Sequence, residues 1–117
     1  MGQSKKWRRV EESREPVQKV LAELKERNGQ FSAPEMWQIV GRSGRRSREV
    51  FRFVAGESFR MAQLRARLTP IRPVVLRTRI PLRRVAEDCG YSKLEKFEKS
   101  YLRVFGITPK DDRNESG

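Results

Sequence analysis

Residues 80–113, IPLRRVAEDCGYSKLEKFEKSYLRVFGITPKDDR, contain the pattern that decides the fold. Apolar residues recur at helical spacing ahead of two glycines, first at Leu82, Val85, Ala86 and Cys89, and then at Phe97, Tyr101 and Phe105. Gly90 and Gly106 end these stretches, because glycine takes the left-handed conformation of a helix terminus at little cost. Ser92 is a suitable cap for the second helix. The stretch therefore predicts a short helix, a turn and a second helix, the helix-turn-helix motif.

The same plan occurs earlier, in residues 31–56. Residues 32–35, SAPE, have the composition of a capping box, which opens a helix that Gly41 ends. Ser43 begins another helix, which ends near Gly56. We therefore predict a second helix-turn-helix unit in the first half of the chain.

The remaining segments also have helical spacing. Glu15-Pro16 opens a helix with one apolar stripe, which a glycine turn ends. Between the two units, Ser58 caps a helix that Thr69-Pro70 interrupts, with Thr69 as the cap and Pro70 as the first residue of the restarted helix. Because no segment alternates apolar and polar residues over the length of a strand, we predict an all-α fold.

The predicted organisation is two helix-turn-helix subdomains joined by a linker helix that proline interrupts. The basic residues 1–14 form an arm, which we interpret as a disordered terminus with contact along DNA as the alternative, and the domain occupies residues 15–115. Within it, the first unit covers about residues 31–56, the linker about 58–79 and the second unit about 80–106.

Basic residues are concentrated in the middle of the chain. The net charge is +12, from 27 Lys and Arg against 15 Asp and Glu, which implies a polyanionic partner. Residues 42–84 hold thirteen Arg, no Lys and two Glu, whereas residues 1–41 have a net charge of +2 and residues 85–117 one of −1. Arg suits bidentate contact with phosphate or guanine better than Lys does. Nucleic acid and an acidic protein both fit this charge, whereas the chain lacks the amphipathic helix of lysine and aromatic residues that a membrane surface would require.

The residue types that most enzymes and metal sites need are scarce. The chain has no His and one cysteine, Cys89, so it cannot form an internal disulfide or a usual zinc site. It also has no glycine-rich phosphate loop, no paired carboxylates and no nucleophile beside a base. We therefore expect no enzyme activity, no cofactor and no metal, and we interpret Cys89 as a small buried core residue. Because there is no apolar run of about 18 residues and no secretion signal, we expect a cytoplasmic protein that does not enter the membrane.

Residues 80–113 resemble the second helix-turn-helix of the AraC/XylS DNA-binding domain. They include the closing signature of that family, Gly-x-Thr-Pro-x-x-x-Arg, here Gly106, Thr108, Pro109 and Arg113. Residues 31–56 resemble the first unit of the family, and the likeness extends over about residues 16–113. The chain departs from the family pattern at a few positions: Trp37 replaces a small alanine, Arg42 and Ser47 replace apolar residues, Asp112 replaces an aromatic residue, and Pro70 and Pro73 lie in the linker helix.

The resemblance implies a transcription regulator that binds double-stranded DNA in the bacterial nucleoid. Stand-alone members of the family bind as monomers, with one recognition helix in each of two neighbouring major-groove segments about 34 Å apart. The resemblance also implies an activator that contacts RNA polymerase. The alternative is a basic protein-interaction module or anti-regulator that binds an acidic protein partner, and sequence-tolerant packaging of nucleic acid is a third hypothesis.

In the first unit, we expect the recognition helix to run from about Gly44 to Ala55. By the resemblance, its base-facing residues are Arg45, Arg48 and Glu49, and we assign phosphate contacts to Arg46 and Arg52. An Arg at a base-facing position can donate to O6 and N7 of guanine. An ordinary exposed helix face is the alternative interpretation of this pattern.

In the second unit, we expect the recognition helix to run from about Ser92 to Val104. By the resemblance, base- or backbone-contacting positions are occupied by Leu94, Glu95, Lys96, Glu98 and Lys99. We assign base contacts to Leu94, Glu95 and Lys96 and phosphate contacts to Glu98, Lys99 and Arg103, with an ordinary exposed helix face again as the alternative. Glu95 can accept from N4 of cytosine, but Glu95 and Glu98 would face phosphates at an electrostatic cost. We therefore expect the first unit to supply most of the affinity. Non-specific attraction is assigned to Arg60, Arg65, Arg67, Arg72, Arg77, Arg79, Arg83 and Arg84.

Overall fold

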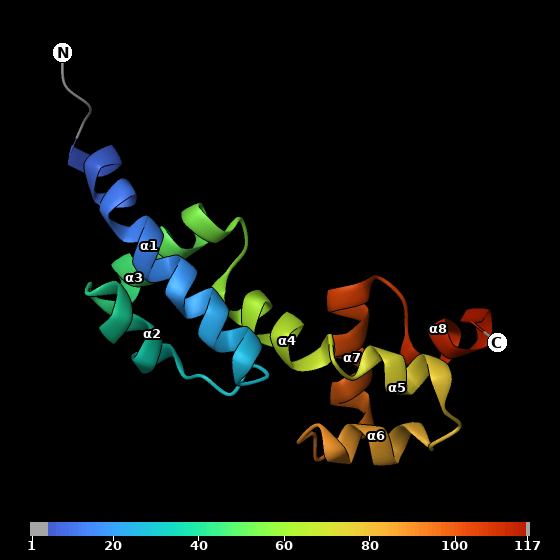
Figure 1. Ribbon diagram of the computed structural model, residues 1–117. Helices are drawn as coiled ribbons and strands as arrows, with labels where there is room; N and C mark the ends of the chain where they lie inside the picture. Colours follow the sequence, from blue (N-terminus) through green and yellow to red (C-terminus); the bar gives the residue numbers. More distant parts are fainter. Residues whose placement is uncertain (1–4, 117) are drawn as a thin grey trace. The chain divides into compact units, whose positions relative to one another are not determined.

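The computed structural model describes the backbone of residues 5–116 and the side chains of residues 11–116. Every regular element in this part of the chain is a helix, and none of these residues forms a strand (Figure 1). The helices are α1 (Lys5–Glu26), α2 (Ala33–Val40), α3 (Gly44–Ala55), α4 (Phe59–Leu68), α5 (Arg72–Arg77), α6 (Leu82–Asp88), α7 (Leu94–Phe105) and α8 (Pro109–Ser116). The chain divides into two compact units, one up to Gln63 and the other from Leu64, so the boundary falls within α4. The predicted all-α class is confirmed.

The first unit is built on α1, α2 and α3, and α1 packs against both of the other helices. All three helices contribute buried apolar residues, which are Val17, Val20, Leu24, Met36, Val40 and Phe51. Phe59, at the start of α4, packs edge-on against Phe51, with the ring centroids 5.5 Å apart. Removal of these side chains from water is the main stabilisation of the unit.

α1 begins earlier than we predicted. We expected a helix to open at Glu15-Pro16 behind an arm of residues 1–14, but α1 is already formed at Lys5 and contains Pro16 in its interior. A proline at this position removes one backbone hydrogen bond and usually indicates a helix start. Ser13 on one side of Pro16 and Val17 on the other are both buried, so tertiary packing overrides the local preference of proline. Residues 1–4 of the expected arm lie outside the described residues.

α2 and α3 form the predicted helix-turn-helix of the first unit, and their ends match the expected residues. The Ser32 hydroxyl accepts from the Glu35 N–H at 3.2 Å, and the Ser32 N–H donates to the Glu35 carboxylate at 2.7 Å, which completes the capping box. Gly41 ends α2 with a φ of 75°, a conformation that strains other residues. The hydroxyl of Ser43 caps the first turn of α3, which ends at Gly56.

The second unit contains α5 to α8, and α6 and α7 form its helix-turn-helix. α6 packs against α7, and α5 packs against α6 and α8. Aromatic rings line the interior in sequence: the centroids of Tyr91 and Phe97 are 5.7 Å apart, those of Phe97 and Tyr101 5.8 Å, and those of Tyr101 and Phe105 4.6 Å. Such tilted and edge-on pairs add specific orientation to the burial of apolar surface.

The prediction that Thr69 caps the restarted linker helix is wrong. The Thr69 hydroxyl donates back to the carbonyl of Arg65 at 2.6 Å, within the last turn of α4, and α5 has no side-chain cap. α5 instead begins at Arg72, after Ile71 at the N-cap, and Pro73 lies in its first turn as expected. The linker is therefore two short helices, α4 and α5, separated by a turn.

The predicted cap of the second recognition helix is also wrong. α7 begins at Leu94 without a side-chain cap, rather than at Ser92, and it ends at Phe105. The backbone closes the preceding turn instead, because the N–H of Tyr91 donates to the carbonyl of Ala86 at 2.9 Å. This bond extends the turn beyond the glycine and moves the helix start further along the chain.

Asp112, one of the departures from the family pattern, is buried and accepts hydrogen bonds from two helices. Arg72 of α5 donates to its two carboxylate oxygens at 2.9 and 3.3 Å, and the Tyr101 hydroxyl of α7 donates at 2.5 Å. The bonds from Arg72, followed by that from Tyr101, hold the pKa of Asp112 below its ordinary value. The next residue, Arg113, donates its Nε hydrogen to the carbonyl of Val75 at 2.8 Å. These contacts attach α8 to α5 and α7.

Candidate nucleic-acid interface

α3 has one buried face and one exposed, basic face. Ser47 and Phe51 are completely buried and fix how the helix is turned. The hydroxyl of Ser47, at a position that is usually apolar in the family, donates to the carbonyl of Arg42 at 3.1 Å and is thus satisfied. All of the α3 residues that we assigned to DNA contacts are exposed: Arg45, Arg46, Arg48, Glu49 and Arg52. Four arginines against one glutamate make this a positive surface suited to nucleic acid.

Arg45 and Glu49 form an ion pair on the exposed face of α3. The Arg45 Nε lies 3.5 Å from a carboxylate oxygen of Glu49, and the two side chains are 90% and 58% exposed. An ion pair between such exposed residues is weak and is screened by salt. Arg45 therefore remains available to a nucleic acid that approaches this face.

Arg48 makes a different kind of contact. Its guanidinium carbon lies 5.4 Å from the ring of Trp37 on α2, in a cation–π arrangement. From the sequence alone, Trp37 was only a departure from the family pattern, and this contact was not predicted. The signal that was available is Gly44, a residue without a side chain at the start of α3, where a large neighbour can be accommodated.

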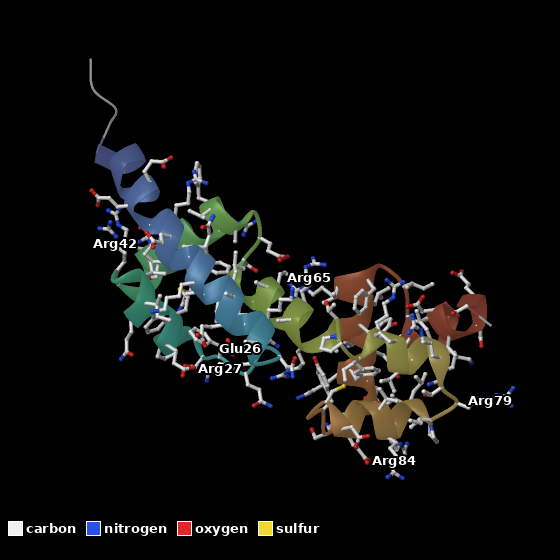
Figure 2. The ribbon with its side chains drawn as sticks, viewed as in Figure 1. Glu26, Arg27, Arg42, Arg65, Arg79 and Arg84 are labelled. Atoms are coloured by element: carbon white, nitrogen blue, oxygen red, sulfur yellow. The ribbon has the colours of Figure 1, made fainter. Side chains whose placement is uncertain are left out.

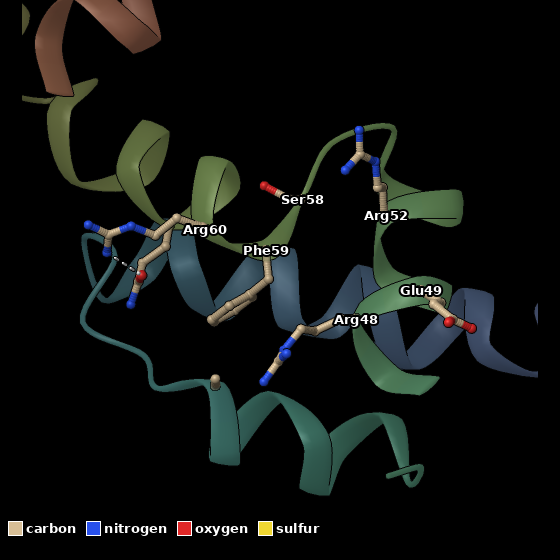
Figure 3. A pocket seen from close by; sticks show the side chains of 8 residues that line it. Arg48, Glu49, Arg52, Ser58, Phe59 and Arg60 are labelled. Atoms are coloured by element: carbon tan, nitrogen blue, oxygen red, sulfur yellow. Dashed lines mark hydrogen bonds between the residues drawn. The ribbon is translucent and has the colours of Figure 1, made fainter. Parts of the chain in front are cut away.

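A hollow of about 470 Å³ lies beside α3. Its lining comes from α3, from the start of α2 and from the start of α4 with the residue before it, and it includes Arg48, Glu49, Arg52, Ser58, Phe59 and Arg60 (Figure 3). Figure 3 shows the side chain of Arg48 directed toward α2, whereas that of Arg52 is directed away from α2. Arg60, which donates to Gln63 at 3.3 Å, belongs to the same hollow. Arg60 is thus placed beside the first recognition helix, although we had assigned it only a general electrostatic role.

Two arginines of the linker are engaged within the second unit. Arg72 pairs with Asp112 and also lies over the ring of Phe105, with its guanidinium carbon 4.9 Å from the centroid. The guanidinium carbon of Arg67 lies 5.6 Å from the ring centroid of Tyr91. The general attraction to DNA that we expected from Arg72 is therefore reduced by a carboxylate of the protein itself.

Other arginines differ in their surroundings. Arg42 lies 3.7 Å from a carboxylate oxygen of Glu12 on α1. Arg79 and Arg84 are exposed, and Figure 2 shows both projecting away from the ribbon of the second unit. These two side chains have the exposure that a general electrostatic role requires.

α7 has a mixed-charge outer face. Phe97 and Tyr101 are completely buried on its inner face. Of the residues that we assigned to DNA contacts, the exposed ones are Glu95, Lys96, Lys99 and Arg103, and the half-buried ones are Leu94 and Glu98. A second hollow, of about 540 Å³, adjoins the start of α7, and charged residues of both signs line it, among them Arg83, Glu87, Glu95 and Glu98. This face attracts a polyanion less strongly than the face of α3 does.

Exposed apolar side chains are a feature that sequence analysis missed. Phe53 on α3 is 55% exposed and Leu102 on α7 is 46% exposed. Neither residue falls at the helical spacing of the buried residues of its helix, so the helical period could have predicted that both are exposed.

Cys89 is half-buried, rather than the buried core residue that we expected, because it lies at the C-cap of α6 and not within the helix. Burial, with a smaller contribution from Asp88, raises the pKa of its thiol to about 11. Among the residues that the structure describes, no three Cys, Asp or Glu side chains are grouped as a metal site would need. Over the same residues, no helix combines the length and the apolar character that crossing a membrane requires.

Comparison with known proteins gives the family. Residues 36–115, more than half of the chain, match the family model described as a helix-turn-helix domain. A similar solved structure is the C-terminal domain of AraT, a response regulator from Geobacillus stearothermophilus, with a TM-score of 0.68 and 17% identity over 86% of this chain and 84% of that one. At this identity the likeness shows the fold, and no curated protein matches the chain. The chain belongs to the AraC-type helix-turn-helix family, whose members are DNA-binding transcription regulators and not enzymes.

Proposed function

We propose that this chain is a sequence-specific regulator that binds double-stranded DNA as a monomer, with α3 and α7 in neighbouring major-groove segments. The exposed face of α3, with four arginines and one glutamate opposite a buried face, is the observation that supports this proposal. Base contacts are assigned to Arg45, Arg48, Glu49, Leu94, Glu95 and Lys96, and phosphate contacts to Arg46, Arg52, Glu98, Lys99 and Arg103. The resemblance to the family supports an activator that contacts RNA polymerase in the bacterial cytoplasm.

The two recognition helices contribute unequally in this proposal. α3 supplies most of the affinity, because its outer face is strongly positive whereas that of α7 carries two carboxylates among its cations. Each phosphate contact that is removed should reduce the slope of log affinity against log salt by about 0.9. Replacing Arg46 and Arg52 with glutamine should reduce the affinity more than replacing Lys99 and Arg103, because α3 has the more positive outer face, whereas either double replacement removes two phosphate contacts and should change the slope alike. The reverse order would contradict the assignment of affinity to α3.

Selection of binding sites from a random duplex pool tests sequence specificity. The selection is run near physiological salt, where a Debye length of about 8 Å screens general attraction. We expect an asymmetric motif of two boxes about one helical turn, or 34 Å, apart. Enrichment of a single box would contradict base recognition by α7. Binding without any enrichment would refute the proposal.

The assignment of Arg48 to a base has its own test, with Arg52 as the matched control on the same helix. Arg48→Ala should weaken binding to the selected site much more than binding to a site with one changed base pair, so that discrimination falls by roughly tenfold. Arg52→Ala should weaken binding to both sites equally, because phosphate contacts carry no sequence information. Equal losses for Arg48→Ala would make Arg48 a phosphate contact.

A second candidate function is supported by the mixed charge of α7. Glu95 and Glu98 near the second hollow are unusual for a surface that faces phosphates, and they suit a protein partner with basic groups of its own. This candidate predicts that reversing their charge with lysine leaves DNA affinity unchanged. If α7 faces DNA, the same substitutions change the DNA affinity and steepen its salt dependence.

A further inference from the structure

We infer that Trp37 is a positioning residue for base recognition: its indole holds Arg48 and fixes the start of α3. The inference rests on the proposed function, because it concerns how α3 presents its arginines to DNA. It adds a residue on α2 that touches no base in the proposal.

The first observation is the contact between the indole and Gly44. A Cβ atom built on Gly44 would lie 2.8, 2.9 and 3.1 Å from three carbon atoms of the Trp37 ring, and the two shorter distances are ones that real Cβ atoms essentially never show. The ring therefore lies directly against the backbone of the first turn of α3. A rigid aromatic surface at this place limits how the start of α3 can tilt relative to α2.

The second observation is the cation–π contact with Arg48. Arg48 follows Gly44 by one helical turn and lies on the same side of α3, so one indole contacts two successive turns of the recognition helix. The Arg48 side chain is exposed and would otherwise sample many rotamers. The indole, the strongest partner for a cation among aromatic rings, favours the rotamers that keep the guanidinium near α2.

Arg52 is the residue of α3 with which Arg48 can be compared. It lies one turn beyond Arg48, yet Figure 3 shows its side chain directed away from α2. Two arginines at equivalent positions of successive turns thus have different surroundings, and Trp37 is the neighbour that distinguishes them. Arg52 is therefore a matched control for any effect that passes from Trp37 to Arg48.

The indole N–H provides a means to separate positioning from stability. It is buried, and it has no hydrogen-bond acceptor among the described residues, which is a cost to the folded state. Phenylalanine keeps an aromatic face without that N–H, whereas leucine keeps apolar volume without an aromatic face. We therefore expect Trp37→Phe to fold as stably as the parent chain, and Trp37→Leu to lose the attraction to Arg48.

The experiment measures discrimination between the selected DNA site and a site changed at the base pair that Arg48→Ala affects. Trp37→Leu should reduce discrimination about two- to fivefold, the equivalent of one exposed cation–π contact. Trp37→Phe should reduce it less. In the background of Arg48→Ala, Trp37→Leu should cause no further loss, whereas its effect should be fully retained in the background of Arg52→Ala. Ile39→Ala, a half-buried position on the same helix, controls for lost packing and should leave discrimination unchanged.

A second measurement does not depend on DNA. In a Trp7→Phe background, Trp37 is the only tryptophan, and Arg48→Ala should change its fluorescence emission while Arg52→Ala should not. The inference is overturned if Arg48→Ala leaves the fluorescence emission of Trp37 unchanged, or if Trp37→Leu keeps full discrimination between the two DNA sites. It is also overturned if the losses of discrimination caused by Trp37→Leu and Arg48→Ala add in the double variant. Failure of the proposed function is distinguishable, since the parent chain would then select no motif at all.

Discussion

Replacing Asp112 with asparagine should destabilise the second unit by about 2 kcal/mol. The substitution keeps the size of the side chain but removes the charge that accepts two hydrogen bonds from Arg72 and one from Tyr101. Hydrogen bonds to a charged group contribute about 1.5–3 kcal/mol. The Arg72 side chain is 41% exposed, so solvent already weakens its part of the interaction and the lower half of that range applies. A loss of this size lowers the melting temperature of a small domain by roughly 10 °C.

The stabilisation by the Asp112 carboxylate should be lost at acidic pH. The folded-state pKa of Asp112 lies below its ordinary value of 3.8, first because of the hydrogen bonds from Arg72. A carboxyl group with a lowered folded-state pKa contributes its stabilisation fully above its unfolded-state pKa, and it loses that stabilisation as the pH falls through the folded-state pKa. The difference between the parent chain and Asp112→Asn should therefore be constant near neutral pH and should shrink in acid below the ordinary value.

Urea unfolding followed by circular dichroism, from neutral pH down to about pH 2, measures both effects. Asp111→Asn is the control, because it makes the same change of charge at the neighbouring exposed position. If Asp112→Asn unfolds within about 0.5 kcal/mol of Asp111→Asn at neutral pH, the hydrogen bonds that we describe do not stabilise the unit. A difference that fails to shrink in acid would also refute the argument.

Other predictions concern caps and the cysteine. Ser32→Ala removes the hydroxyl that caps α2 and should lower the free energy of unfolding by about 1 kcal/mol in urea titrations, whereas Ser32→Asp should be nearly neutral. Gly41→Ala, at a φ of 75°, should cost about 1 kcal/mol in the same assay, and a smaller loss is expected for Gly41→Asn because asparagine tolerates this conformation; equal losses would contradict the backbone argument. Because its thiol pKa is raised to about 11, Cys89 should react with iodoacetamide at neutral pH much more slowly in the native chain than in urea, and rapid native alkylation would show an accessible thiolate.

Local signals predicted the fold wherever neighbours in sequence determine the structure. The capping box at Ser32 and the left-handed glycines that end α2, α3 and α7 depend only on adjacent backbone groups, and all were predicted. The errors have the opposite cause. Pro16 lies inside α1 because buried residues on both sides hold the helix together, and the Thr69 hydroxyl bonds backward rather than forward. In each case a contact that propensity does not describe outweighs the local preference.

For the candidate site too, the local pattern predicted the features that depend on neighbours in sequence and not the contacts between helices. Helical periodicity was sufficient to predict which face of α3 is exposed. It did not show which arginines have partners, because those partners lie on other helices: Trp37 for Arg48, and Asp112, 40 residues away, for Arg72. From the sequence, eight of the thirteen arginines of residues 42–84 received the same general electrostatic role, and the folded chain distinguishes among them.

The contact between Trp37 and Gly44 constrains how this sequence can have diverged. Alanine or a larger residue at position 44 would collide with the indole, whereas glycine is compatible with either a small or a large residue at position 37. The alanine typical of the family at position 37 can therefore be replaced by tryptophan only after position 44 has become glycine. If tryptophan came first, it would collide with the side chain at position 44, and that intermediate would be strained. Among descendants the two positions should covary, and a return to a side chain at position 44 should follow the loss of tryptophan.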